Sequence, residues 1–309
     1  MSVPILIDCD PGHDDAIAIM LALASPEVDV LGITTVAGNQ TLDKTTWNAL
    51  RVLEFIGRAD VPLAVGADRP LVRAPFVAAH VHGESGLDGP DLPDPTVAPV
   101  ELHAVDFLAE QIERSSVPVT VVPVGPLTNV ALLLARHPDV ASRIERVVLM
   151  GGAIAEGNIT PAAEFNVWAD PEAAARVFES GLDLTMVGLD VTHKALMTRE
   201  HAEQLRGAGK VGRMVAELFD FFHGYHRRTY GFDGSPIHDA LAVAHVLRPG
   251  LLETAHRHVA VDCRSELCRG RTVVDLWRRT GNEPNARVGV AVDGAAFMDL
   301  LLERLSTYP

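Results

Sequence analysis

Short runs rich in β-branched residues alternate with amphipathic stretches along this chain, and that alternation constrains the fold more than any other feature of the sequence. The runs predict strands over residues 3–7, 28–36, 62–65, 117–122, 147–150, 184–189 and 287–292. The other stretches predict helices over residues 16–24, 42–56, 105–114, 127–137, 171–180, 200–205, 211–225, 237–246 and 295–305. Strands that alternate with helices form right-handed βαβ units. We therefore expect an α/β fold with a mostly parallel central sheet flanked by helices.

The sequence contains no internal boundary that would divide this fold. At 309 residues the chain is long enough for one large α/β domain or two small ones. We find no repeat, low-complexity tract or linker, so we expect a single domain over residues 1–309. The segment 73–99 is rich in Gly, Pro, His and Asp and predicts one long functional loop.

Composition excludes several classes of function. The net charge is −15 and no basic stretch could neutralise phosphates, which argues against binding a nucleic acid polymer. The apolar stretches are shorter than a membrane span. The 3 cysteines are odd in number and lack zinc-finger spacing, and no secretory signal follows Met1. We therefore expect a cytoplasmic protein that works in a reducing compartment.

Four carboxylates follow the first predicted strand within a few residues of one another. They are Asp8, Asp10, Asp14 and Asp15. Burying so much negative charge is costly unless a positive charge lies beside it. Helix capping would account for one or two of these residues, but not for all of them. Oxygen ligands suit a hard divalent cation, so the pattern favours a calcium or magnesium site.

Polar residues also follow the other predicted strands. In an open α/β sheet, ligands bind beyond the carboxyl ends of the strands. The residues placed at or near that edge are Asn39, Val124, Met150, Asn158, Glu164, Asn166, Asp190, His238 and Asp239. A rim of Asp, Asn and Glu oxygens with one or two histidines suits a polyhydroxyl substrate held next to a hard cation.

Residues 8–16, Asp-Cys-Asp-Pro-Gly-His-Asp-Asp-Ala, carry a resemblance to a known family. They resemble the N-terminal signature of the calcium-dependent nucleoside hydrolases, the inosine-uridine preferring family. Further matching segments occur in family order at residues 125–129, 150–152, 164–166, 170–173 and 238–240. The resemblance runs from residue 5 to about 292. It implies an enzyme that hydrolyses the N-glycosidic bond of a small ribonucleoside, commonly assembled as a homodimer or homotetramer.

The resemblance also implies the metal site and the general base. Asp10, Asp15 and Asp239 match the side-chain ligands of Ca²⁺, and Val124 matches a ligand that binds through its main-chain carbonyl. Asp14 matches the carboxylate that removes a proton from the attacking water.

The remaining matches concern the substrate. The residues that resemble ribose contacts are Asn39, Asn158, Glu164, Asn166 and Met150. Taken alone, Asn39 after Gly38 would be read as a turn residue. His82 matches a position on the base side, and His238 matches a histidine that protonates the leaving base in one subgroup. That subgroup prefers inosine and uridine or pyrimidine nucleosides. Tyr225 and Tyr230 are both candidates for the base pocket, and spacing does not choose between them.

Two alternatives remain open at this point. An aspartyl-phosphate phosphatase also places two Asp residues two apart after its first strand, which would make Asp8 the nucleophile and Asp10 the acid. That pattern requires Thr or Val where this chain has Gly12, and it gives Asp14 no role. The second alternative is a catalytically inactive nucleoside- or sugar-binding regulator.

Overall fold

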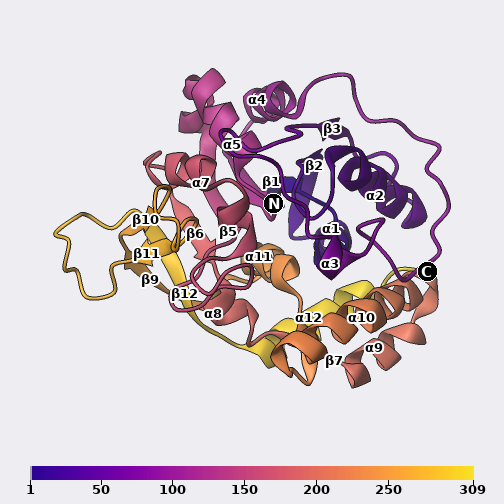
Figure 1. Ribbon diagram of the computed structural model, residues 1–309. Helices are drawn as coiled ribbons and strands as arrows, with labels where there is room; N and C mark the ends of the chain where they lie inside the picture. Colours follow the sequence, from indigo (N-terminus) through magenta and orange to yellow (C-terminus); the bar gives the residue numbers. More distant parts are fainter. Residues whose placement is uncertain (1) are drawn as a thin grey trace.

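An eight-stranded sheet lies at the centre of the computed structural model, which describes residues 2–309 (Figure 1). The strand order is β3-β2-β1-β4-β5-β6-β12-β9. The strands are β1 (Val3–Cys9), β2 (Val28–Thr35), β3 (Leu63–Val65), β4 (Val119–Pro123), β5 (Ile144–Met150), β6 (Leu184–Val187), β9 (Leu252–Arg257) and β12 (Ala286–Val292). Every neighbouring pair is parallel except β12 and β9. The predicted α/β fold with a mostly parallel sheet is confirmed.

Helices cover both faces of the sheet, which is why its central strands are almost continuously apolar. Side chains alternate between faces along β1: Ile5 and Ile7 join one hydrophobic cluster, and Leu6 joins the other. The helices that supply the first cluster are α1 (His13–Leu23), α2 (Leu42–Phe55), α9 (Arg199–Arg206), α10 (Gly209–Tyr230), α11 (His238–Leu247) and α12 (Gly294–Leu305). Those that supply the second are α4 (Ala104–Arg114), α5 (Thr128–Arg136) and α7 (Pro171–Phe178).

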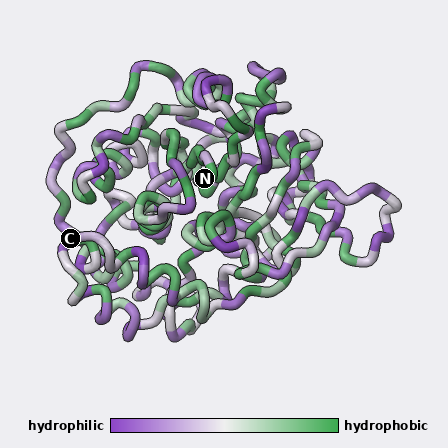
Figure 2. The backbone as a smooth tube through the Cα atoms, turned by 180° about the vertical axis from the view of Figure 1, so that it is seen from behind, coloured by the Kyte–Doolittle hydropathy of each residue, from purple (hydrophilic) through white to green (hydrophobic). Residues whose placement is uncertain are grey.

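Several short elements were not predicted from the sequence. Two small antiparallel pairs join β7 (Leu196–Thr198) to β8 (Gly234–Pro236), and β10 (Val259–Val261) to β11 (Thr272–Val274). The loop between β11 and β12 projects from the molecule (Figures 1 and 2). Short helices α6 (Phe165–Ala169) and α8 (Leu189–Thr192) follow β5 and β6. In residues 2–309, no helix combines the length and apolar character needed to cross a membrane.

Three differences from the predicted elements matter for function. Helix α1 begins at His13, three residues before the predicted start at 16, so its first turn includes two acidic residues that favour a helix N-terminus. Helix α10 continues past residue 225 to Tyr230, where Gly231 at φ 70° ends it in the left-handed conformation. The segment 73–99 is not loop throughout, because residues 79–82 form the short helix α3 (Ala79–His82).

Candidate active site

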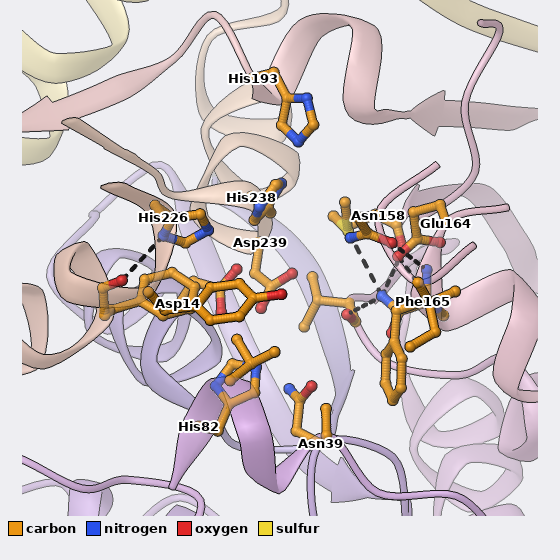
Figure 3. A pocket seen from close by; sticks show the side chains of 18 of the residues that line it. Asp14, Asn39, His82, Asn158, Glu164, Phe165, His193, His226, His238 and Asp239 are labelled. Atoms are coloured by element: carbon orange, nitrogen blue, oxygen red, sulfur yellow. Dashed lines mark hydrogen bonds between the residues drawn. The ribbon is translucent and has the colours of Figure 1, made fainter. Parts of the chain in front are cut away.

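A pocket opens at the carboxyl ends of the central parallel strands (Figure 3). The predicted site residues that line it are Asp14, Asn39, His82, Val124, Met150, Asn158, Glu164, Asn166, His238 and Asp239. In the close-up, Asp14 and Asp239 lie between a group of histidines on one side and Asn158 with Glu164 on the other. The remaining predicted residues, Asp10 and Asp15, contact the lining residue Asn39. The structure therefore brings the predicted set together.

Three carboxylates meet at the ends of two helices. Asp14 and Asp15 lie in the first turn of α1, and Asp239 lies in the first turn of α11. Each offers an oxygen within 4.8 Å of the others. The main-chain N–H groups at these helix ends partly offset the negative charge. Asp15 is held in place because it accepts hydrogen bonds from the N–H groups of Asp10 at 3.1 Å and Gly12 at 3.0 Å.

Asp10 stands beside this trio, at the end of β1. Its Oδ2 accepts the main-chain N–H of Asn39 at 2.7 Å. Its Oδ1 is buried and finds no hydrogen-bond donor among residues 2–309. Glycines make room for the carboxylate on both sides. A Cβ at Gly125 would lie 2.5 Å from Oδ1, and one at Gly38 would lie even closer to Oδ2. An unpartnered carboxylate oxygen in such a cradle fits a cation ligand.

The electrostatics of the cluster call for a positive charge. Burial, followed by the neighbouring carboxylates, raises the pKa of Asp14 to about 8 and raises the pKa of Asp10 and of Asp239 well above the usual range. Within the described part of the chain, no lysine or arginine forms an ion pair with these carboxylates. The donor set consists of oxygens, which suits a hard divalent cation. These residues therefore fit a metal site.

The carbonyl of Val124 lies next to the cluster and also belongs to the pocket wall. It accepts the side-chain amide of Asn166 at 2.7 Å, and the same amide donates to the carbonyl of Met150 at 3.1 Å. A carbonyl oxygen has two lone pairs, so this hydrogen bond leaves one for another partner. The two bonds fix the orientation of the Asn166 amide between β4 and β5.

Glu164 has a structural role that the sequence did not reveal. It caps α6: its carboxylate accepts the N–H groups of Gly152 at 2.8 Å, Asn166 at 2.8 Å and Val167 at 3.2 Å. Burial nevertheless raises its pKa to about 7. Asn158 supports the same turn, because its Oδ1 accepts the N–H of Phe165 at 2.9 Å. The polar wall opposite the histidines is thus preorganised by main-chain hydrogen bonds.

Asn39 is more than a turn residue. Its side-chain amide donates to Oδ2 of Asp15 at 3.0 Å and to the carbonyl of Asp10 at 3.2 Å. It therefore connects the pocket wall to Asp10 and Asp15, which do not themselves line the pocket.

The other side of the pocket is built from imidazole and aromatic rings. His238 is buried, and its Nδ1 lies 2.7 Å from Oγ1 of Thr192. Burial, together with His193, His226 and His82, lowers the pKa of His238 well below its usual value. At neutral pH the ring is therefore uncharged, so only one of its two nitrogens carries a hydrogen.

Sequence reasoning missed several residues on this side. Phe222, His226 and Tyr230 line the pocket together with His193 and Tyr225, and of these five residues only the two tyrosines were predicted candidates. The first three are spaced four apart on α10, so they share one face of the helix, and that spacing could have identified them. Both candidate tyrosines line the pocket, so the choice between them does not arise.

Asp8 is excluded as a nucleophile by its position. It is 0% exposed, and its Oδ1 accepts the side chains of Thr34 at 2.5 Å and Asn129 at 2.8 Å. Burial raises its pKa to about 7. The phosphatase alternative requires this carboxylate to attack a substrate, which its enclosed position prevents.

Comparison with known proteins gives a consistent result along the whole chain. A family model described as inosine-uridine preferring nucleoside hydrolase matches residues 5–299. The chain is 54% identical over 310 residues to a pyrimidine-specific ribonucleoside hydrolase, RihA, from Escherichia coli O7:K1, and the match covers 100% of both chains.

Solved structures also match this chain in their fold. A purine-preferring ribonucleoside hydrolase from Gardnerella vaginalis superposes with a TM-score of 0.93 at 33% identity, covering 99% of this chain and 98% of the other. A plant nucleoside hydrolase superposes with a TM-score of 0.92 at 34% identity, covering 99% of both chains.

Proposed function

Because the chain belongs to the inosine-uridine preferring nucleoside hydrolase family, we propose that it hydrolyses the N-glycosidic bond of ribonucleosides to free base and ribose. The observation that carries this proposal is the pocket itself, in which buried carboxylates lie between a polar wall and a wall of imidazole and aromatic rings. The polar wall suits the hydroxyls of a sugar, and the rings suit a planar base.

We assign the metal site to Asp10, Asp15, Asp239 and the carbonyl of Val124, and the metal to calcium. When bound, the ion would neutralise the carboxylates and supply the positive charge that makes a nearby water more acidic. Asp14 accepts the proton from the water that attacks C1′ of the ribose. Positive charge develops on the ribose as the bond breaks, and the surrounding carboxylates and amides stabilise it.

The remaining residues hold and release the substrate. Asn39, Asn158, Glu164, Asn166 and Met150 are placed to contact the ribose. His238 donates its pocket-facing N–H to the departing base. The proton donor, His238, and the general base, Asp14, act from opposite sides of the sugar. The reaction therefore inverts the configuration at C1′ in a single step.

We propose that the preferred substrates are pyrimidine ribonucleosides. The relative named for pyrimidine specificity is 54% identical to this chain, whereas the one named for purine preference is 33% identical. A panel assay of ribose release from uridine, cytidine, inosine, adenosine and nicotinamide riboside tests both activity and preference. Uridine and cytidine should give the highest kcat/KM. Binding of nucleosides without ribose release would instead support the inactive regulator.

Three further expectations stay predictions. They are a homodimeric or homotetrameric state, a cytoplasmic location, and the action of residues 1–309 as one domain. Sedimentation of the purified chain tests the first of these directly.

A further inference from the structure

His193 lines the pocket, but neither the proposed mechanism nor the family resemblance gives it a role. It directly follows α8, and its side chain is 10% exposed. In Figure 3 its ring extends from the rim of the pocket toward His238 and the interior. Its neighbours are the rings of Phe232, His238 and Tyr230, with centroids 5.3 Å, 5.6 Å and 5.9 Å away. His193 therefore belongs to the ring-lined side, which suits the base of the substrate.

A carboxylate fixes the orientation of this ring. Nδ1 of His193 lies 3.0 Å from Oε1 of Glu156. An ionised carboxylate can only accept a hydrogen bond, so Nδ1 carries the hydrogen. Because Nδ1 is turned toward Glu156, Nε2 is the nitrogen that remains for the pocket. In the uncharged form of the ring, Nε2 has no hydrogen and is an acceptor.

The segment that carries Glu156 is attached to α8 by hydrogen bonds. The carboxylate of Asp190, in α8, accepts the main-chain N–H groups of Ile154 at 2.5 Å and Ala155 at 3.2 Å. These two residues immediately precede Glu156, so Asp190 holds the chain alongside α8. Glu156 is thereby placed within reach of His193, at the end of the same short helix.

The same segment also reaches the sugar side of the pocket. Asn158 lies two residues after Glu156 and is one of the residues placed to contact the ribose. Its main-chain carbonyl lies 3.4 Å from the hydroxyl of Tyr230. Collapse of the whole segment would therefore disturb binding of the ribose, whereas loss of the Glu156 carboxylate alone would disturb only His193.

The contact between Glu156 and His193 matters more for orientation than for stability. The side chain of Glu156 is 55% exposed. Ion pairs and hydrogen bonds of carboxylates that exposed contribute little to the free energy of unfolding. The consequence of the contact is the direction in which the two nitrogens of His193 point.

We propose that Glu156 is a positioning residue that turns Nδ1 of His193 away from the pocket, so that Nε2 accepts a hydrogen bond from an N–H group of the nucleobase. This deepens the proposed function and rests on it. The ligand class is a nucleoside whose base has a donor on its edge, such as N3–H of uracil or the amino group of cytosine. Such a contact forms when the substrate binds and is not strengthened as the departing base gains negative charge. It therefore lowers KM and has little effect on kcat.

The hydrogen on Nδ1 can be measured without any assay of activity. Protein labelled with ¹⁵N-histidine and loaded with calcium gives long-range ¹H–¹⁵N correlations that identify the protonated nitrogen of each ring. The signals that disappear in His193→Ala belong to His193. At pH 8 we expect its hydrogen on Nδ1 in the wild type and a shift of the hydrogen toward Nε2 in Glu156→Ala. A hydrogen on Nε2 in the wild type would overturn the proposal.

Steady-state kinetics at pH 8, where imidazoles are mostly uncharged, test what the contact does. In Glu156→Ala we expect KM for uridine to rise roughly three- to tenfold, the scale of one hydrogen bond, with kcat within about twofold of wild type. KM for p-nitrophenyl riboside, which lacks the base N–H, should not change. Tm should stay within roughly 3 °C of wild type, because an exposed pair stabilises the fold little.

Two further variants show how Glu156 acts. Glu156→Gln loses the charge but keeps an oxygen that accepts the hydrogen of Nδ1, so KM for uridine should stay within about twofold of wild type. His193→Ala should raise KM at least as much as Glu156→Ala does. Adding Glu156→Ala to it should have no further effect, because the carboxylate acts only through the imidazole.

The matched control is a second contact between a carboxylate and an imidazole, outside the pocket. Oδ1 of Asp106 lies 2.8 Å from Nε2 of His137, and neither residue lines the pocket. Asp106→Ala should leave KM for both substrates unchanged.

Four results would overturn the proposal. They are an unchanged KM for uridine in Glu156→Ala, an equal rise for uridine and p-nitrophenyl riboside, a loss in Glu156→Gln as large as that in Glu156→Ala, and additive effects in the double variant. Failure of the proposed function itself would appear separately, as a wild-type protein that releases no ribose.

Discussion

The hydroxyl of Thr192 lies 2.7 Å from Nδ1 of His238, and both residues are buried. Thr192 is the last residue of α8, the short helix that follows β6, whereas His238 is the first residue of α11. If the hydroxyl donates to Nδ1, the hydrogen of the neutral imidazole lies on Nε2, where it can be donated to the base. The pair therefore connects a side chain at the sheet edge to the chemistry of the leaving group.

Substitution of Thr192 tests that connection. Thr192→Val preserves the branched shape but removes the hydroxyl, so kcat for uridine should fall roughly five- to tenfold, the scale of one lost hydrogen bond. Thr192→Ser keeps the hydroxyl and should retain most of the activity. Steady-state kinetics of the two variants, side by side, provide the measurement. Equal loss in both would mean that the methyl group matters and the hydroxyl does not.

His238→Ala tests the donor itself. Uracil and hypoxanthine are poor leaving groups that need a donor, whereas nitrophenolate departs readily without one. We expect kcat for uridine to fall by about a hundredfold or more, the scale of general acid catalysis. Hydrolysis of p-nitrophenyl riboside should stay close to wild type. A parallel loss on the two substrates would make the role of His238 structural, through its neighbour Asp239.

Asp14→Ala should behave differently, because the attacking water must be activated whatever the leaving group. We expect kcat to fall about a hundredfold or more on uridine and on p-nitrophenyl riboside alike. Binding of a ribose-like inhibitor, measured by calorimetry, should be much less affected. Activity within a few-fold of wild type would show that Asp14 only stabilises the N-terminus of α1 and does not act as a base.

Much of this site could be predicted because it depends on local sequence. Asp10, Asp14 and Asp15 follow β1 within a few residues, so their chemistry and their place at the sheet edge are evident together. Asp239 could be placed near the same edge, but its role as a metal ligand beside them came only from the family resemblance, since its proximity results from the packing of α11 against α1.

Part of the ring-lined side was not predicted, for a physical reason. His193 and His226 come from two separate segments, and their meeting depends on how α10 packs and how far it extends. The edge strand β9 was missed because its residues are half-exposed and lack clear alternation. Glu164 suited a sugar ligand on chemistry alone, and only the structure reveals its hydrogen bonds to the start of α6.

Removal of the metal should make stability depend on pH in an unusual direction. In the metal-free protein the pKa of Asp14 is raised from 3.8 to about 8 and that of Glu164 from 4.5 to about 7. A carboxyl whose pKa is higher in the folded state contributes stability at acid pH and loses it as pH rises through the folded value. Chelated protein should therefore become less stable between about pH 5 and pH 8.

Thermal unfolding with chelator and with added calcium measures this effect. Calcium should raise Tm most at the alkaline end, because the carboxylates are then ionised and repel one another. A chelated protein whose Tm is constant over that range, or one that calcium does not stabilise, would contradict the assignment of the metal site.

The most direct measurement follows the oxygen atom that enters the sugar. Uridine is incubated with the calcium-loaded protein in H₂¹⁸O, the products are separated, and their masses are measured by mass spectrometry. The proposed hydrolysis predicts uracil together with free ribose that carries ¹⁸O at C1, with no requirement for phosphate. Two results would contradict it. One is release of uracil only when phosphate is present, with formation of ribose 1-phosphate. The other is no cleavage of any nucleoside in the panel.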